Sequence, residues 1–161
     1  MSSIDELLDN SRRAQAPGSG LASAPARRLA IVACMDARLD VAALLGLEPG
    51  DAHVIRNAGG IVTDDVLRSL LLSQRLLGTR EIMLIKHTDC GMQTFEGDEL
   101  ADALERETGE RPSFPLGSFR DLEAEMRRSM ARIRESPFVP HIDAVRGFVY
   151  EVETGRLVEV R

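Results

Sequence analysis

The sequence has no tryptophan, a single tyrosine and only two cysteines among its 161 residues. With so few aromatic side chains, it lacks the stacking surface on which binders of single-stranded nucleic acid depend. The formal net charge of −6 also argues against a general nucleic-acid binder, because neutralising phosphates requires a basic surface. We therefore expect no nucleic-acid partner.

Long apolar runs are also missing. No run approaches the roughly 20 apolar residues that span a bilayer, so we expect no membrane association. Residues 1–6 are acidic and lack the apolar core of a secretory signal, which predicts a cytoplasmic protein. In that compartment, paired thiols serve metal binding or catalysis more often than they form a disulfide.

The chain is long enough for one domain with a real core. Residues 3–13 predict a short helix with a narrow apolar stripe, and the composition of 14–20 is that of a linker. A marginal helix is rarely stable alone. We therefore expect residues 1–26 to be an arm that packs on the main domain or on a second copy of the chain, or else a frayed terminus. Residues 27–161 are expected to form a single domain.

Short apolar runs alternate with helical patterns from residue 29 onward. We expect strands over 29–33, 52–56, 81–86, 144–152 and 157–160, and helices over 39–45, 64–77, 98–108 and 118–135. Such alternation is typical of an α/β fold with a central, mostly parallel sheet flanked by helices. The composition of 153–156 predicts a hairpin turn, so the C-terminal strand should be antiparallel.

Polar turns follow three of the predicted strands directly, at Cys34, at Asn57 and at His87 to Cys90. Ligands of open parallel sheets bind outside the carboxyl ends of the strands, so these turns are expected at one site. If the first and third strands are parallel neighbours, Cys34, His87 and Cys90 meet at one edge. Three protein ligands and an open fourth position are the arrangement of a catalytic zinc.

Asp36 and Arg38 lie two and four residues beyond Cys34. A guanidinium can hold a carboxylate as a bidentate pair, which would keep Asp36 ionised and able to orient an oxygen at the metal. The alternative is an ordinary surface ion pair worth ~0–1 kcal/mol. The position next to a ligand favours the functional interpretation.

Together these motifs resemble the β-class carbonic anhydrases. In order, they are Cys-x-Asp-x-Arg after one strand, Arg-Asn-Ala-Gly after the next, and His-x-x-Cys-Gly-Met after a later strand. The form Cys-Met-Asp-Ala-Arg is similar to that of the compact actinobacterial-type members. The resemblance implies one zinc ion per chain on Cys34, His87 and Cys90, with Asp36 and Arg38 as the catalytic dyad.

The resemblance also implies an activity and an assembly. The activity is that of a carbonate dehydratase, a lyase: zinc would lower the pKa of a water so that it releases a proton, and the resulting hydroxide would add reversibly to carbon dioxide to give bicarbonate. The assembly is a homodimer or a higher even oligomer, with the N-terminal segment across the partner subunit. We expect Asn57, Ala58, Gly59 and Gly60 to bind substrate, because glycine lets the backbone approach closely.

Two alternatives stay open. Related proteins use the same ligand set to hydrolyse carbon disulfide or carbonyl sulfide, which are also small, linear and apolar. A non-enzymatic zinc- or redox-responsive module would instead use the thiols to hold the fold, and it predicts a closed site with a fourth protein ligand. Elsewhere, we expect His53 to be a packed core histidine, Asp89 to cap its turn, and the charges of 120–135 to form a solvated helix face.

Overall fold

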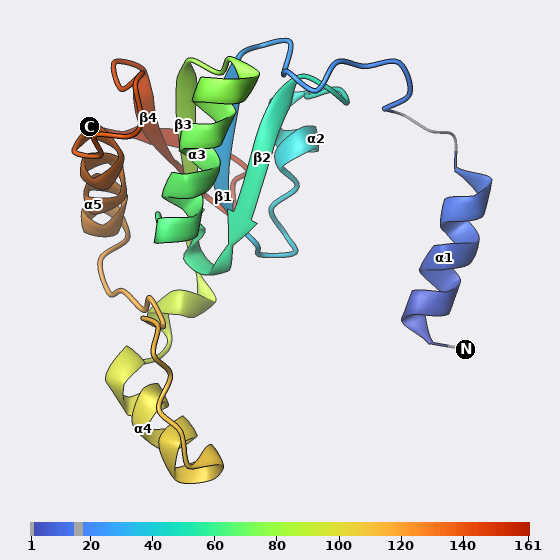
Figure 1. Cartoon of the computed structure of the whole chain (residues 1–161). Coiled ribbons are helices and arrows are strands. Elements are labelled where there is room, and N and C mark those ends of the chain that lie inside the picture. Colours follow the sequence, from blue (N-terminus) through green and yellow to red (C-terminus); the bar gives the residue numbers. More distant parts are fainter. Residues whose placement is uncertain (1, 15–17) are drawn as a thin grey trace.

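The protein is described by a computed structural model that covers residues 2–14 and 18–161. Figure 1 shows a central sheet with helices packed on it and a helix at the N-terminus that stands apart. The sheet has five strands in the order β2-β1-β3-β4-β5. Their bounds are Leu29–Cys34 (β1), Ala52–Asn57 (β2), Glu81–His87 (β3), Val145–Tyr150 (β4) and Leu157–Val160 (β5).

Strand direction confirms the predicted fold class. β1 pairs in parallel with both β2 and β3, and β3 pairs in parallel with β4. β5 is antiparallel to β4, as the hairpin composition predicts. Since β1, β2 and β3 are parallel neighbours, their carboxyl ends share one edge of the sheet.

In the part of the chain that the structure describes, five α-helices accompany the strands. They are Ser3–Arg13 (α1), Val41–Leu45 (α2), Asp64–Leu77 (α3), Gly97–Thr108 (α4) and Leu122–Arg134 (α5), and short 3-10 turns cover Ala58–Gly60 and Gly91–Gln93. Two helices begin later than expected because an aspartate side chain caps each. Asp40 accepts a hydrogen bond from the Ala43 N–H at the start of α2, and Asp121 accepts one from the Ala124 N–H at the start of α5.

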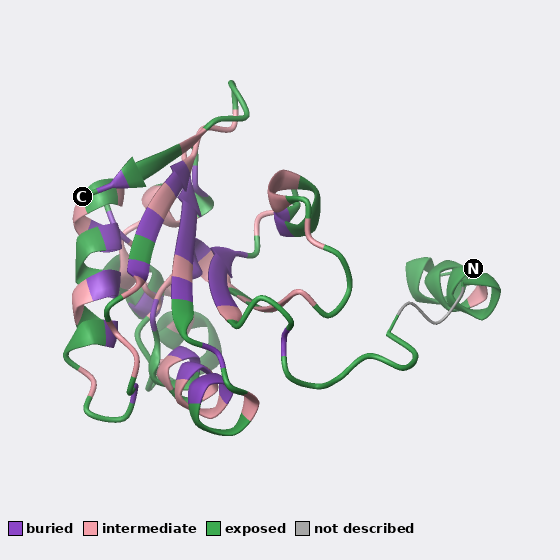
Figure 2. Cartoon of the chain, turned by 90° about the horizontal axis from the view of Figure 1, so that it is seen from above, coloured by how far each residue is buried: buried purple, intermediate pink, exposed green. Residues whose placement is uncertain are grey.

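The two faces of the sheet carry separate apolar cores. On one face, α3 and α5 contribute Val66, Leu70, Met126 and Ile133 against the buried strand residues, Leu84 among them. On the other face, the α2 region packs against Ile31, Ala33 and Ile85, and this second core includes Cys34 and Cys90. Figure 2 shows the resulting burial of the inner strands. The ligand thiols are therefore part of a packed core.

α1 has no buried residue and stands away from the sheet (Figures 1 and 2). The Ser2 hydroxyl and the Asp5 carboxylate form a capping box at its start. Its apolar side chains, Ile4, Leu7 and Leu8, are 50–70% exposed. Residues 15–17 of the expected linker lie outside the described part, and the division of the chain at residue 26 stays a prediction.

The backbone of Gly60, just after β2, packs closely on the end of β1. Its φ is +57°, and a Cβ there would lie 2.9 Å from the backbone nitrogen of Cys34. Gly78 also has a left-handed backbone, with φ +74°, but a Cβ there would have nothing within 4 Å.

We expect Gly78→Ala to lower the free energy of unfolding by ~1–2 kcal/mol, the usual cost of the left-handed conformation. Gly60→Ala should add an overpacking cost of ~1–3 kcal/mol. The two variants can be compared by urea unfolding. Equal losses of unfolding free energy in Gly60→Ala and Gly78→Ala would contradict the close packing of Gly60 on Cys34.

Candidate metal centre

Three of the predicted ligands lie together in the structure. One possible ligand atom from each of Cys34, His87 and Cys90 lies within 4.8 Å of the other two. All three side chains are buried, and both cysteines are free thiols. Among the described residues, no fourth His, Cys, Asp or Glu offers an atom within 4.8 Å of all three, although Asp36 Oδ2 lies 3.6 Å from His87 Nε2. The arrangement therefore has the three-ligand form that leaves a position open.

Strand order explains why these residues meet. Cys34 is the last residue of β1 and His87 is the last residue of β3, and the two strands are hydrogen-bonded neighbours. The chain then turns through Asp89, whose φ of +55° is a left-handed conformation that aspartate tolerates. This tight turn places Cys90 beside the histidine.

His87 is held ready to coordinate a metal. Its Nδ1 donates to the Thr88 carbonyl oxygen at 2.9 Å, which leaves Nε2 with a free lone pair. Among the described residues, Nε2 of His87 is the buried side-chain nitrogen or oxygen that lacks a hydrogen-bond partner. An orphaned buried nitrogen is costly. Its place in one group with the two cysteine sulfurs fits a bound metal ion.

The two thiols have opposite pKa shifts. The Cys90 thiol donates to the Cys34 sulfur and lowers the pKa of Cys34 far below its usual range, against the effect of burial. Backbone N–H groups near the Cys34 sulfur lower it further. The same contact with Cys34, together with burial, raises the pKa of Cys90. Without a metal, one sulfur is a thiolate and the other its hydrogen-bond donor.

Asp36 and Arg38 form the predicted bidentate pair. Arg38 Nη2 and Nε donate to the two carboxylate oxygens of Asp36 at 2.9 and 3.0 Å, and the Arg38 backbone N–H adds a third bond at 2.9 Å. These bonds hold the pKa of Asp36 well below its usual range. Asp36 Oδ2 lies 3.6 Å from His87 Nε2, so an ionised carboxylate borders the ligand group.

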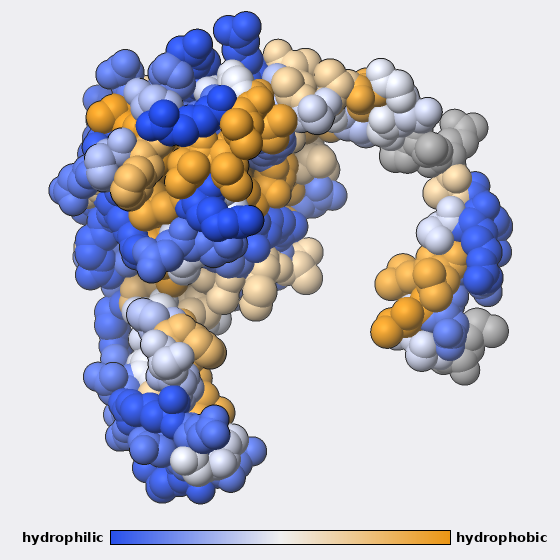
Figure 3. Space-filling view, viewed as in Figure 1, coloured by the Kyte–Doolittle hydropathy of each residue, from blue (hydrophilic) through white to orange (hydrophobic). Residues whose placement is uncertain are grey.

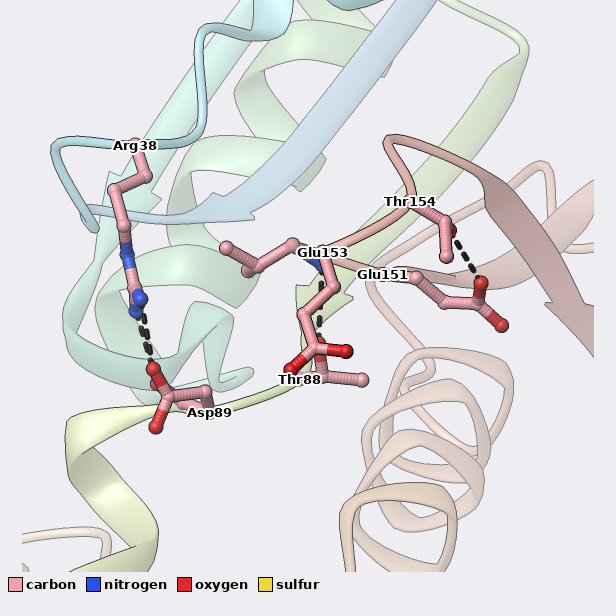
Figure 4. Close-up of a pocket in the computed structure, with 7 residues that line it drawn as sticks. Arg38, Thr88, Asp89, Glu151, Glu153 and Thr154 are labelled. Atoms are coloured by element: carbon pink, nitrogen blue, oxygen red, sulfur yellow. Dashed lines mark hydrogen bonds and ion pairs between the residues drawn. The ribbon is translucent and has the colours of Figure 1, made fainter.

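Asp89 has a different role from the predicted turn cap. Arg38 Nη1 donates to Asp89 Oδ2 at 2.7 Å, and Nη2 donates to the Asp89 carbonyl oxygen at 2.9 Å. Figure 4 shows this contact at the edge of a surface pocket of about 590 Å³, which Arg38, Thr88 and Glu151 also line. Arg38 thus links the loop of Asp36 to the turn between His87 and Cys90 through hydrogen bonds to both.

The four residues expected to bind substrate occupy different positions. Ala58 and Gly59 border a pocket of about 150 Å³ at the ligand group, which is also lined by Cys34, Met35, Asp36, Cys90, Gly91 and Met92. Asn57 organises its loop, donating to the Ile61 carbonyl at 2.8 Å and accepting from the Ile61 N–H at 2.9 Å. Gly60 packs on the Cys34 backbone. The loop thus gives two residues to the pocket wall.

Sequence reasoning missed two buried charged residues, Lys86 and Glu125. Lys86 is 1% exposed, and burial lowers its pKa to about 8 against the opposing effect of Glu125 and the two sulfurs. Glu125 is 8% exposed, on the α5 face that was expected to be fully solvated. The sequence did offer a signal for Lys86, because a lysine at the end of an apolar strand indicates a buried ammonium, which needs polar partners. His53 is half-buried and bonds Ser73, as a structural histidine would.

An α/β sheet with two cysteines and a histidine at its strand ends defines a class of metal-binding proteins with an open coordination position. The comparisons specify the family. Residues 29–111 match the family model described as carbonic anhydrase. The chain is 53% identical over 156 residues to beta-carbonic anhydrase 1 of Mycobacterium tuberculosis, covering 97% of this chain and 96% of that protein. The chain belongs to the β-carbonic anhydrases.

Other relatives agree with this assignment. A crystal structure of carbonic anhydrase from Streptococcus mutans superposes with a TM-score of 0.88 at 41% identity, covering 100% of this chain and 99% of that one. A protein named carbon disulfide hydrolase, from Saccharolobus solfataricus, is 41% identical over 156 residues, covering 81% of this chain and 76% of that protein. The same scaffold thus carries two named activities.

The thiol pair makes a spectroscopic prediction. In the metal-free protein, absorbance at 240 nm should show one thiolate per chain at pH 7, because Cys90 donates to an ionised Cys34. In Cys90→Ala, the remaining thiol loses this donor and should titrate at a higher pH than Cys34 does in the unsubstituted protein. Cys34→Ala should leave a protonated thiol at pH 7. Two thiols that ionise together near the ordinary range would contradict the hydrogen-bonded pair.

Proposed function

We propose that this protein is a zinc-dependent carbonic anhydrase that catalyses the reversible hydration of carbon dioxide to bicarbonate and a proton. The observation that carries the proposal is the buried group of Cys34, His87 and Cys90, in which Nε2 of His87 has no hydrogen-bond partner. Two thiolates and an imidazole are a donor set that suits zinc. The three-ligand form favours an enzyme over a module that uses its metal only to hold the fold.

Zinc, when bound, would lower the pKa of a water molecule and so supply the nucleophile for carbon dioxide. The protein supplies the orientation. Asp36, kept ionised by Arg38, can accept a hydrogen bond from a water in the pocket. This bond would direct a lone pair of the water oxygen toward the substrate. Met35, Ala58 and Met92 give that pocket an apolar wall, which suits an apolar substrate.

The pocket is small, at about 150 Å³. It therefore suits a triatomic substrate rather than a larger carbonyl compound. Carbon disulfide is the natural comparison substrate, given the activity that the Saccharolobus solfataricus relative is named for. Release of sulfide, assayed beside carbon dioxide hydration, measures the preference directly.

The proposal includes a cytoplasmic homodimer or a higher even oligomer. The apolar stripe of α1, formed by Ile4, Leu7 and Leu8, has no cover within the described residues (Figure 3). Figure 3 also shows apolar side chains gathered over α3 and the edge strand β2, where Leu76 is 74% and Val54 is 44% exposed. A second copy of the chain could cover such surfaces. None of the helices in the described part of the chain combines the length and apolarity that crossing a bilayer requires.

Metal content tests the proposal most directly. The unsubstituted protein should contain about one zinc ion per chain and hydrate carbon dioxide in stopped-flow assays at pH 7.5 and pH 8.5. Cys34→Ser should lose most of the zinc and the activity at both values, because a hydroxyl replaces a thiolate ligand. A Cys34→Ser protein that keeps both its zinc and its rate would refute the ligand assignment.

Asp36 is expected to act in catalysis without being needed for metal binding. Asp36→Asn removes the acceptor but keeps the shape, and we expect kcat/KM to fall by ~10²-fold or more with zinc content unchanged. Asp89→Asn is the matched control, since the Asp89 side chain is 81% exposed and also pairs with Arg38. It should lower kcat/KM by less than about threefold, since exposed ion pairs contribute little. Equal effects of the two substitutions would contradict the role of Asp36.

A further inference from the structure

Lys86 is a buried cation directly before the ligand His87, at the end of β3. Its side chain is 1% exposed, and Nζ donates to the carbonyl oxygens of Gly59 and Gly60 at 3.0 Å each. Both glycines have left-handed backbones, with φ of +76° and +57°. Lys86 thus fastens the loop after β2 in a conformation that needs glycine.

This loop packs against the Cys34 ligand. The backbone of Gly60 lies so close that a Cβ there would come within 2.9 Å of the Cys34 nitrogen. Gly59 also borders the small pocket at the ligand group. Any shift of the two carbonyls that Lys86 holds would therefore displace backbone that packs directly on the Cys34 backbone.

The surroundings of Lys86 are built to keep a cation in place. Glu125 Oε1 lies 3.7 Å from Nζ, and Ser129 Oγ donates to the same carboxylate oxygen at 3.0 Å. Arg128 Nη2 donates to the other oxygen, Oε2, at 2.6 Å. The ring of Phe119 faces Nζ, with its centroid at 5.4 Å. For fold stability alone, apolar residues of similar volume often do as well as a buried ion pair.

We propose that Lys86 is a positioning residue for the metal centre, which keeps the backbone of Gly59 and Gly60 packed against Cys34 by holding the carbonyl oxygens of both glycines. This inference rests on the proposed zinc function. A residue that acts only on the fold would leave metal affinity unchanged, and this difference makes the proposal testable.

The test is the zinc affinity of Lys86→Met, measured by competition with a chromophoric chelator. We expect zinc to bind at least tenfold more weakly than to the unsubstituted protein, the usual effect of losing an outer partner of a metal ligand. Amide hydrogen exchange at Gly59 and Gly60 should be faster in the same variant. The double variant Lys86→Met/Glu125→Gln also removes the buried carboxylate charge that Lys86 faces. It should show the same loss of zinc affinity, and it serves as the test of the proposal if the single variant does not fold.

Gln74 offers a matched control. Its side chain is 4% exposed and makes two hydrogen bonds with the backbone of His141, both at 2.9 Å, within the α3 core and outside the ligand group. Gln74→Leu should lower the unfolding midpoint and leave zinc affinity within twofold. If the Lys86 variants also stay within twofold while their stability falls, Lys86 is purely structural and the inference is wrong. An unsubstituted protein that binds no zinc would instead refute the proposed function.

Discussion

The parallel pairing of β1 with β3 is the constraint on which the site depends. Cys34 ends one strand and His87 ends the other, so their meeting follows from strand order and direction. The left-handed turn at Asp89 then adds the second sulfur. Because both strands are buried in the sheet centre, the packed core fixes the positions of Cys34 and His87.

Two cationic residues brace this centre from different sides. Arg38 joins Asp36 to the turn at Asp89, near the protein surface. Lys86 joins β3 to the glycine loop after β2, inside the core. Each makes several hydrogen bonds to oxygen atoms near the ligands, so each restricts the conformation of a segment that touches the site. Between these two braced segments, Asp36 borders the small, partly apolar pocket beside Cys34 and Cys90.

Much of this arrangement could be predicted from residue patterns. The apolar runs before Cys34 and His87 marked the strands, and the spacing of the ligands marked their chemistry. Helix starts were less predictable, because the caps at Asp40 and Asp121 place them two and four residues later than the apolar periodicity suggests. Lys86 and Glu125 were missed because each reads locally as an ordinary polar residue. Their burial arises from packing between α5 and β3, which lie far apart in the sequence.

The sequence by itself determined the local facts: which segments are strands, which side chains can bind a metal, and that glycines follow β2. These follow from side-chain chemistry and short-range periodicity. Tertiary structure decided which of those side chains meet. It selected the partners of Arg38 and Lys86, left Nε2 of His87 unpaired, and split the thiols into acceptor and donor. Such outcomes depend on distances between segments that are remote along the chain, and only packing sets those distances.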